Sequence, residues 1–133
     1  MSPVDARGLV ATHAELRAFA LPQGWAIVPL DAEVLDAIAG RIGKAAAEIV
    51  PSLSAGRIVA EIETDYFGGS GQQRAAVWRD GAASFGPTGW HDGGAINDAL
   101  RVLGVRRGLG DEFDALELVR FRRFDDFAHA TPL

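Results

Sequence analysis

Apolar and polar residues alternate with a period of two along the run from Arg57 to Phe67. This period is typical of a β-strand, because successive side chains point to opposite faces of a sheet. One face of the run is mostly apolar and the other carries three carboxylates: Ile58, Ala60, Ile62, Thr64 and Tyr66 against Glu61, Glu63 and Asp65. We call these three carboxylates the acidic row. The apolar face is expected to pack on a core, and the acidic row to face water or a partner.

Two turn signals divide the residues that follow into further strands. The Gly-Gly-Ser-Gly sequence at 68–71 interrupts the first strand, since glycine is costly to order and packs little. Asp80-Gly81 is typical of a two-residue hairpin turn. The stretch 57–86 is therefore predicted to be an antiparallel three-stranded meander with its third strand at 82–85. A four-residue first loop gives this register: Phe67 opposite Gln72, Asp65 opposite Arg74, Glu63 opposite Ala76, and Glu61 opposite Trp78.

Two segments outside the meander have helical periodicity with clear ends. Apolar residues recur at helical spacing between Asp31, a good N-cap, and Gly43, which predicts a helix over 32–42. The same spacing before Gly104 predicts a second helix over 95–103. Both helices are expected to cover the apolar face of the sheet. The predicted fold class is α+β, an antiparallel β-meander covered by two to four short helices in a single domain of residues 1–133.

The remaining segments carry weaker signals. Thr12 and Glu15 have the spacing of a capping box, which predicts a short helix near 12–20. Gly86 to Gly94 is rich in turn residues and is expected to be a mobile surface loop. The other expectations are a strand over 25–30, a loop over 51–56, a turn capped by Asp111, and either a late strand or an irregular tail over 119–133.

Composition narrows the function classes. The chain has 133 residues, no cysteine and a net charge of −5, so a disulfide framework, thiolate chemistry and direct nucleic-acid binding are not expected. It has no signal-like N-terminal segment and no run of eighteen apolar residues, so a soluble cytoplasmic protein without membrane contact is expected. Lys44 is the only lysine among thirteen basic residues, which is typical of GC-rich bacterial coding.

Three features have a chemical interpretation beside a structural one. The acidic row could bind a divalent cation or hold a general acid and base, but carboxylates on an open strand are more often a solvated or partner-facing surface. Arg74 after the glycine-rich loop could contact a phosphate, although the loop matches no phosphate-binding motif. His91, between Trp90 and Asp92, could act in acid/base catalysis, but no nucleophile accompanies it. We expect no catalytic residue, no metal site and no cofactor.

The aromatic residues favour an interface. The predicted register places Phe67, Trp78 and Phe85 on the face of the acidic row, with Trp90 near its edge. Rings anchor protein interfaces, and the surrounding charges steer a partner of opposite sign. The alternative is that a helix or the C-terminal segment covers this face.

Three runs carry a resemblance: ETDYFGGSGQQRAAVW, INDALRVLGV and DEFDALEL, within residues 61–118. They resemble small uncharacterised bacterial proteins, and the size and acidic charge are similar to those of immunity proteins, which neutralise secreted toxins. Immunity proteins that act on nucleases offer acidic surfaces to basic active sites. The resemblance implies one of two contact sets: the acidic row, or Asp111, Glu112 and Asp114.

The sequence thus predicts a small non-catalytic bacterial binding protein, an immunity-type inhibitor with a basic toxin or nuclease as its partner and an undetermined oligomeric state. The predicted binding residues are Glu61, Glu63, Asp65, Arg74, Trp78, Trp90 and His91. The alternative is a small enzyme or ligand-binding domain that uses the loops 68–72 and 86–94 around Arg74 and His91.

Overall fold

The computed structural model describes residues 1–67, 70–121 and 124–133. The chain divides into two compact units, residues 1–49 with 116–133 and residues 50–115. Antiparallel sheets and helices occur together, so the predicted α+β class is confirmed. The single domain stays a prediction. Of the predicted loop over 68–71, residues 68 and 69 lie outside the described residues, and so does the predicted side-chain position of Phe67.

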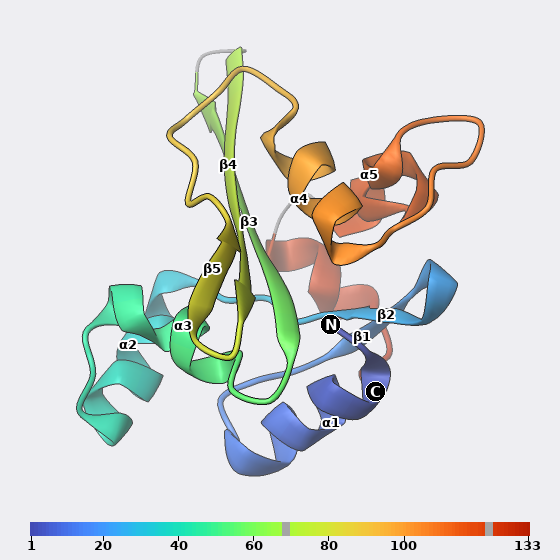
Figure 1. The fold of residues 1–133 in the computed structure, drawn as a ribbon. Helices are drawn as coiled ribbons and strands as arrows, with labels where there is room; N and C mark the ends of the chain where they lie inside the picture. Colours follow the sequence, from blue (N-terminus) through green and yellow to red (C-terminus); the bar gives the residue numbers. More distant parts are fainter. Residues whose placement is uncertain (68–69, 122–123) are drawn as a thin grey trace. The chain divides into compact units, whose positions relative to one another are not determined.

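The predicted meander is the sheet of the second unit. Its strands are β3 (Ile58–Phe67), β4 (Ser70–Arg79) and β5 (Ala82–Phe85), paired antiparallel in the order β3-β4-β5 (Figure 1). Asp80 and Gly81 between β4 and β5 have φ values of 51° and 80°, as the predicted hairpin turn requires. Alternation and turn chemistry therefore located all three strands.

The predicted register was wrong by two residues. Glu63 lies opposite Arg74, and Phe67 lies opposite Ser70, so β3 and β4 pair up to the residues that flank 68–69. The prediction assumed a loop of four residues, 68–71. In the structure residues 70 and 71 belong to β4 and pair with β3, which shifts the pairing by two residues. Because the total shift is an even number, the described side chains of β3 and β4 keep their predicted faces.

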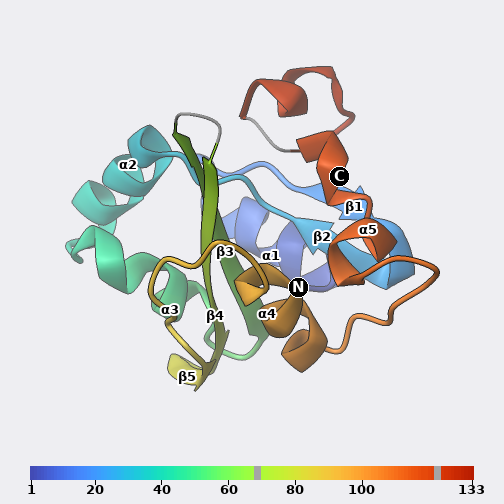
Figure 2. The same cartoon turned by 90° about the horizontal axis from the view of Figure 1, so that it is seen from above.

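Helix α4 (Ala95–Leu103) covers the apolar face of this sheet (Figures 1 and 2). Its small side chains Ala95 and Ala99 pack with Ala75 and Val77 of β4. This part of the predicted cover is confirmed, and the cover by residues 32–42 stays a prediction because that helix belongs to the other unit.

Phe85 lies on the opposite face from the one predicted. It pairs with Val77 and packs against the apolar cluster beneath α4, not beside Trp78. A bulge between Val77 and Trp78 places one extra residue in the β5 side of the ladder. One extra residue exchanges the two faces of a strand, which the regular pairing of the prediction could not show.

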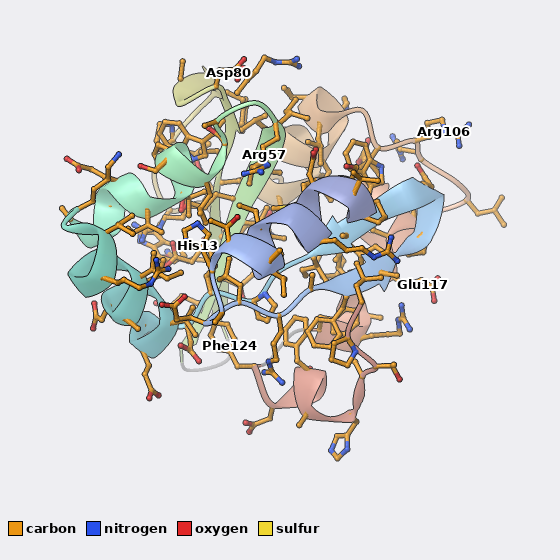
Figure 3. All side chains as sticks on the ribbon, turned by 90° about the horizontal axis from the view of Figure 1, so that it is seen from below. His13, Arg57, Asp80, Arg106, Glu117 and Phe124 are labelled. Atoms are coloured by element: carbon orange, nitrogen blue, oxygen red, sulfur yellow. The ribbon has the colours of Figure 1, made fainter. Side chains whose placement is uncertain are left out.

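The predicted loop 51–56 is partly helical. Helix α3 (Ile49–Leu53) contains Pro51 in its first turn, where a missing N–H costs no hydrogen bond. Ser54, which is fully buried, follows it: its hydroxyl accepts from Gly81 N at 2.8 Å and its carbonyl accepts from Asp80 N at 3.1 Å. Ser54 thereby joins the end of α3 to the β4–β5 turn, whose Asp80 is labelled in Figure 3.

The N-terminal residues of the first unit form a helix that the sequence did not reveal. Helix α1 (Pro3–Thr12) begins after Ser2, whose hydroxyl accepts from Asp5 N at 3.2 Å. The predicted helix over 12–20 is wrong, because Thr12 is the last residue of α1 and its hydroxyl donates to Gly8 O at 3.0 Å. Glu15 forms an ion pair with Arg41 at 2.7 Å instead of a capping box.

A two-stranded sheet follows α1. It pairs β1 (Phe19–Leu21) with β2 (Trp25–Ile27) across a 3-10 turn at Pro22–Gly24. The predicted strand over 25–30 is thus confirmed for its first half. Ala6, Ala18 and Ala26 are buried together, so α1 packs on this sheet through small side chains.

The rest of the first unit consists of one well-defined helix and short turns. Helix α2 (Ala32–Ile42) has the predicted ends: Asp31 accepts from Val34 N at 2.8 Å, and Gly43 is left-handed. The C-terminal residues form 3-10 turns at Leu118–Phe121 and Phe124–His129 rather than a strand. Phe121 and Phe127 stack with ring centroids 4.7 Å apart, and Phe127 packs on Phe19 at 5.0 Å. Packing between these aromatic rings therefore holds part of the segment 119–133, for which the sequence predicted a late strand or an irregular tail.

Candidate functional site

The acidic row and two tryptophans lie on the face of the sheet opposite α4. Arg74 Nε donates to Glu63 Oε2 at 2.7 Å, directly across the β3–β4 pair. Trp78 Nε1 donates to Glu61 Oε1 at 3.1 Å along a diagonal of the same pair. We call this surface, made by the acidic row with Arg74, Trp78 and Trp90, the acidic face.

Arg74 joins the acidic row to Trp90. Its guanidinium carbon lies 4.5 Å from the centre of the Trp90 ring, a cation–π distance. The hydrogen bond to Glu63 raises the pKa of Arg74 above its already high value, so the guanidinium stays charged. Arg74 is therefore engaged on both sides, which argues against the phosphate contact that its position after the glycine-rich loop suggested.

Residues 86–91 continue the third strand along the edge of β4. Thr88 N donates to Ala75 O at 2.9 Å, and Thr88 Oγ1 accepts from Ala75 N at 3.0 Å. His91 then exchanges two backbone hydrogen bonds with Gln73, at 2.7 and 2.9 Å. The segment is on the surface, as predicted, but it is held to β4, and this attachment places Trp90 beside Arg74.

A glycine is required where this extension begins. Gly86 has a φ of +66°, and a Cβ added there would lie 2.6 Å from Ala75 O. Any other residue would combine left-handed strain with a clash against backbone. At Gly89 an added Cβ would meet no atom within 4 Å. Of these two glycines, only Gly86 lies too close to the β4 backbone to carry a side chain.

Exposure differs between the two ends of this face of the sheet. Val59 and Ala76 are 7% and 1% exposed, whereas the side chains of Glu63 and Arg74 are 50% and 45% exposed. Trp90 is 38% exposed. We call the part that carries Glu63, Arg74 and Trp90 the open half of the acidic face, and the cover by a helix or the C-terminal segment stays a prediction.

His91 joins the site through its backbone. Its exposed side chain comes from the segment beside β4, one residue after Trp90. Within residues 1–67, 70–121 and 124–133, no three histidine or carboxylate side chains converge as metal ligands would.

In the second candidate cluster, the carboxylates of Asp111 and Glu112 are engaged within their own unit, whereas Asp114 is exposed. Asp111 accepts from Asp114 N at 2.9 Å and caps helix α5 (Glu112–Ala115), as predicted. Asn97 of α4 donates to the other Asp111 oxygen at 3.0 Å. The bond from the Asp114 backbone, followed by the one from Asn97, lowers the pKa of Asp111. Asp111 thus stabilises a helix start rather than offering a free charge.

Within this cluster, the structure most clearly corrects the expected role of Glu112 as a contact for a partner. It is 1% exposed, and its Oε1 accepts from Arg101 Nε at 3.2 Å. Its Oε2 is buried without a hydrogen bond to any described residue. Glu112 therefore cannot be the interface contact that the resemblance implied, because a side chain below the surface does not reach a partner.

Two polar residues that position the site were not predicted from the sequence. Gln73 accepts from Ile96 N at 2.8 Å and supplies the start of α4 with the cap that Gly94 lacks. Thr88 contributes the hydroxyl that bonds Ala75 N. A glycine at an N-cap indicates that an acceptor must come from elsewhere, but nothing in the sequence indicates which residue supplies it.

No family model, no curated protein sequence and no solved structure matches this chain. In the described parts of the chain, the helices are too short and too polar to cross a membrane.

Proposed function

We propose that this chain is a non-catalytic binding protein whose acidic face meets a basic surface of another protein, as in an immunity-type inhibitor of a toxin or nuclease. The supporting observation is the open half of the acidic face, where Glu63 and Trp90 are exposed and both contact Arg74. Carboxylates and a fixed aromatic ring on one rigid sheet are the components of an interface that selects a cationic partner.

The internal contacts leave this face acidic. Arg74 offsets one of the three charges of the acidic row, and Trp78 donates to Glu61 without changing its charge. The net charge of the whole chain is also negative. Attraction between exposed charges is screened over about 8 Å at physiological salt, so the acidic face should accelerate encounter more than it slows dissociation.

A charge-reversal variant tests the proposal. After a protein partner has been captured from the native cell, the double variant Glu61→Lys/Glu63→Lys should associate roughly tenfold more slowly and with a weaker dependence on salt. The matched control is Glu33→Lys/Asp36→Lys on the exposed surface of α2, which changes the net charge equally. Stopped-flow association measured from low to high salt gives both quantities.

The control variant also defines which results would contradict the proposed interface. Circular dichroism first establishes that both variants fold. If the two variants associate at the same rate, the effect belongs to net charge and the acidic face is not the interface. An unchanged association rate in the Glu61→Lys/Glu63→Lys variant leads to the same conclusion.

A further inference from the structure

Strand β3 is an edge strand, and the direction of its backbone groups follows from those of β4. In the sheet order β3-β4-β5, the outer side of β3 has no neighbouring strand among the described residues. Gln73 and Ala75 of β4 direct their N–H and C=O groups away from β3, toward His91 and Thr88. Their partners across the β3–β4 pair are Thr64 and Ile62. In such non-hydrogen-bonded pairs both residues point outward, so Thr64 and Ile62 point to the outer edge.

The same alternation extends to Ala60, which lies opposite Val77. Ala60, Ile62 and Thr64 thus present three N–H and three C=O groups along the outer edge. No backbone hydrogen bond joins these groups to any described residue. A row of unpaired donors and acceptors at strand spacing is a template for another strand.

The acidic row decides which strand fits. The residues of the row alternate with the outward-pointing ones, so an added strand places its own alternate side chains beside Glu61, Glu63 and Asp65. With a second copy of β3 in antiparallel pairing, every register that overlaps the two rows places carboxylates near carboxylates. Like charges opposite one another are destabilising, so the row disfavours self-association at this edge.

A strand with arginine or lysine at alternate positions has the opposite effect. On the inner side of β3, Arg74 already shows this pairing: it lies across from Glu63 and contacts it at 2.7 Å. A basic strand on the outer side would offer the same contact to the carboxylates of the row. Cross-strand pairs of opposite charge then add to the backbone hydrogen bonds and fix the register.

We propose that β3 accepts an extended basic segment of the protein partner as a fourth strand, with its cationic side chains over the acidic row. This inference rests on the proposed function and names the structure of the contact. Backbone groups of Ala60, Ile62 and Thr64 supply the hydrogen bonds, and the acidic row supplies the selection for charge.

Three synthetic peptides test the inference directly. The probe is a nine-residue peptide with arginine at alternate positions and valine or threonine between them. The first control carries N-methyl groups on the amides that would face β3, which keeps the charge and removes strand pairing. The second control replaces arginine by glutamate. Titration calorimetry should show binding of the probe, at least tenfold weaker binding of the methylated peptide and none of the acidic one, and bound probe should slow amide exchange at Ala60, Ile62 and Thr64.

A pair of variants tests the same edge from the chain. Thr64→Pro removes an outward N–H without removing a bond to β4, and the side chain of Thr64 is exposed. It should weaken binding of the probe about tenfold, a loss similar to that caused by methylation. Thr64→Val keeps the N–H and should weaken binding of the probe much less than Thr64→Pro does. If Thr64→Pro does not fold, the comparison between the probe and the methylated peptide decides the question.

The outcomes separate this inference from the proposed function. Equal binding of the probe and the methylated peptide, or no protection of the three amides, overturns strand addition but leaves a side-chain contact with the acidic face. A probe that does not bind, beside a captured partner that still responds to Glu61→Lys/Glu63→Lys, also overturns strand addition alone. A captured partner that is insensitive to that double variant overturns the proposed function, and this inference with it.

Discussion

Two groups of carboxylates in the second unit differ in their exposure and in their internal contacts. The acidic row lies on a strand, where Glu63 is half-exposed and contacts the guanidinium of Arg74. The group at the junction of α4 and α5 is engaged internally, with Asp111 capping a helix and Glu112 buried against Arg101. Acidic residues that look alike in a sequence therefore differ in what they can offer to a partner.

The backbone around each group explains the difference. A helix start has N–H groups without partners inside the helix, and a nearby carboxylate accepts from them. The N–H groups of a paired strand are already bonded to its neighbour or lie at the sheet edge, in the plane of the sheet rather than near the side chains on its face. The carboxylates of the acidic row are therefore not taken up as helix caps, whereas Asp111 at the start of α5 is.

The largest expected effect concerns the buried carboxylate. Arg101→Ala removes the hydrogen-bonding cation of Glu112, whose side chain is 2% exposed. Breaking a buried ion pair costs roughly 3–5 kcal/mol, and the 59% exposure of Arg101 reduces this to about 2 kcal/mol. The free energy of unfolding, measured by urea titration, should fall by that amount.

Two further variants make this test specific. Asp98 is the other carboxylate on Arg101, at 3.3 Å and exposed, so Asp98→Ala should change stability by no more than about 0.5 kcal/mol. Adding Glu112→Gln to Arg101→Ala should recover part of the loss, because a neutral amide is less costly to bury than an unpaired carboxylate. No recovery would show that Arg101 acts through the packing of its stem and not through charge.

The expected effect of intermediate size concerns Asp111, the cap of helix α5. Asp111→Ala leaves Asp114 N without its acceptor and should lower the free energy of unfolding by about 1 kcal/mol at neutral pH. Asp111→Asn, which retains a cap oxygen, should lose less. An equal loss in both variants would mean that charge rather than hydrogen bonding holds this turn.

The pKa of Asp111 gives this prediction a pH dependence. Its pKa in the fold lies below the ordinary value of 3.8, mainly because the Asp114 backbone donates to the carboxylate. The unfolded chain therefore takes up the proton first as pH falls, and the carboxylate stabilises the fold above about pH 3.8. The stability difference between the native chain and Asp111→Asn should shrink as pH falls below that value through the pKa of the folded state.

The sequence predicted those parts of the fold that local signals determine. Alternation located β3, and Asp31 with Gly43 gave both ends of α2. Helix α1 was missed because its apolar residues form no single stripe, although Ser2 before Pro3 is a good helix start. Phe85 was placed on the wrong face because a bulge depends on pairing across strands, which no local pattern records.

The candidate site was predictable as a set of residues but not as an arrangement. The period of two gave the acidic row its common face, and a register shift of two residues left that face unchanged. The contact of Arg74 with Trp90 depends on the path of residues 86–91 along β4, which is set by Thr88 and Gln73. Such nonlocal hydrogen bonds have no sequence signature, so the burial of Glu112 and the exposure of Glu63 could not be distinguished in advance.

The smallest expected effect concerns the exposed pair on the acidic face. Glu63 and Arg74 contact each other at 2.7 Å, closer than Arg101 and Glu112, yet both side chains are about half exposed. Water already solvates such charges, and exposed pairs contribute about 0.2–1 kcal/mol. A double-mutant cycle with Glu63→Gln and Arg74→Gln should give a coupling energy in that range, and 1 M salt should reduce it.

The corresponding cycle with Arg101→Gln and Glu112→Gln provides the comparison. Its coupling energy should be larger and less sensitive to salt, because the carboxylate of Glu112 is shielded from solvent ions. If the two cycles gave equal energies with equal salt dependence, burial would not distinguish the two groups, and distance alone would rank them. The expected order instead leaves the acidic row with little role in stability, so its substitution can change partner binding without unfolding the chain.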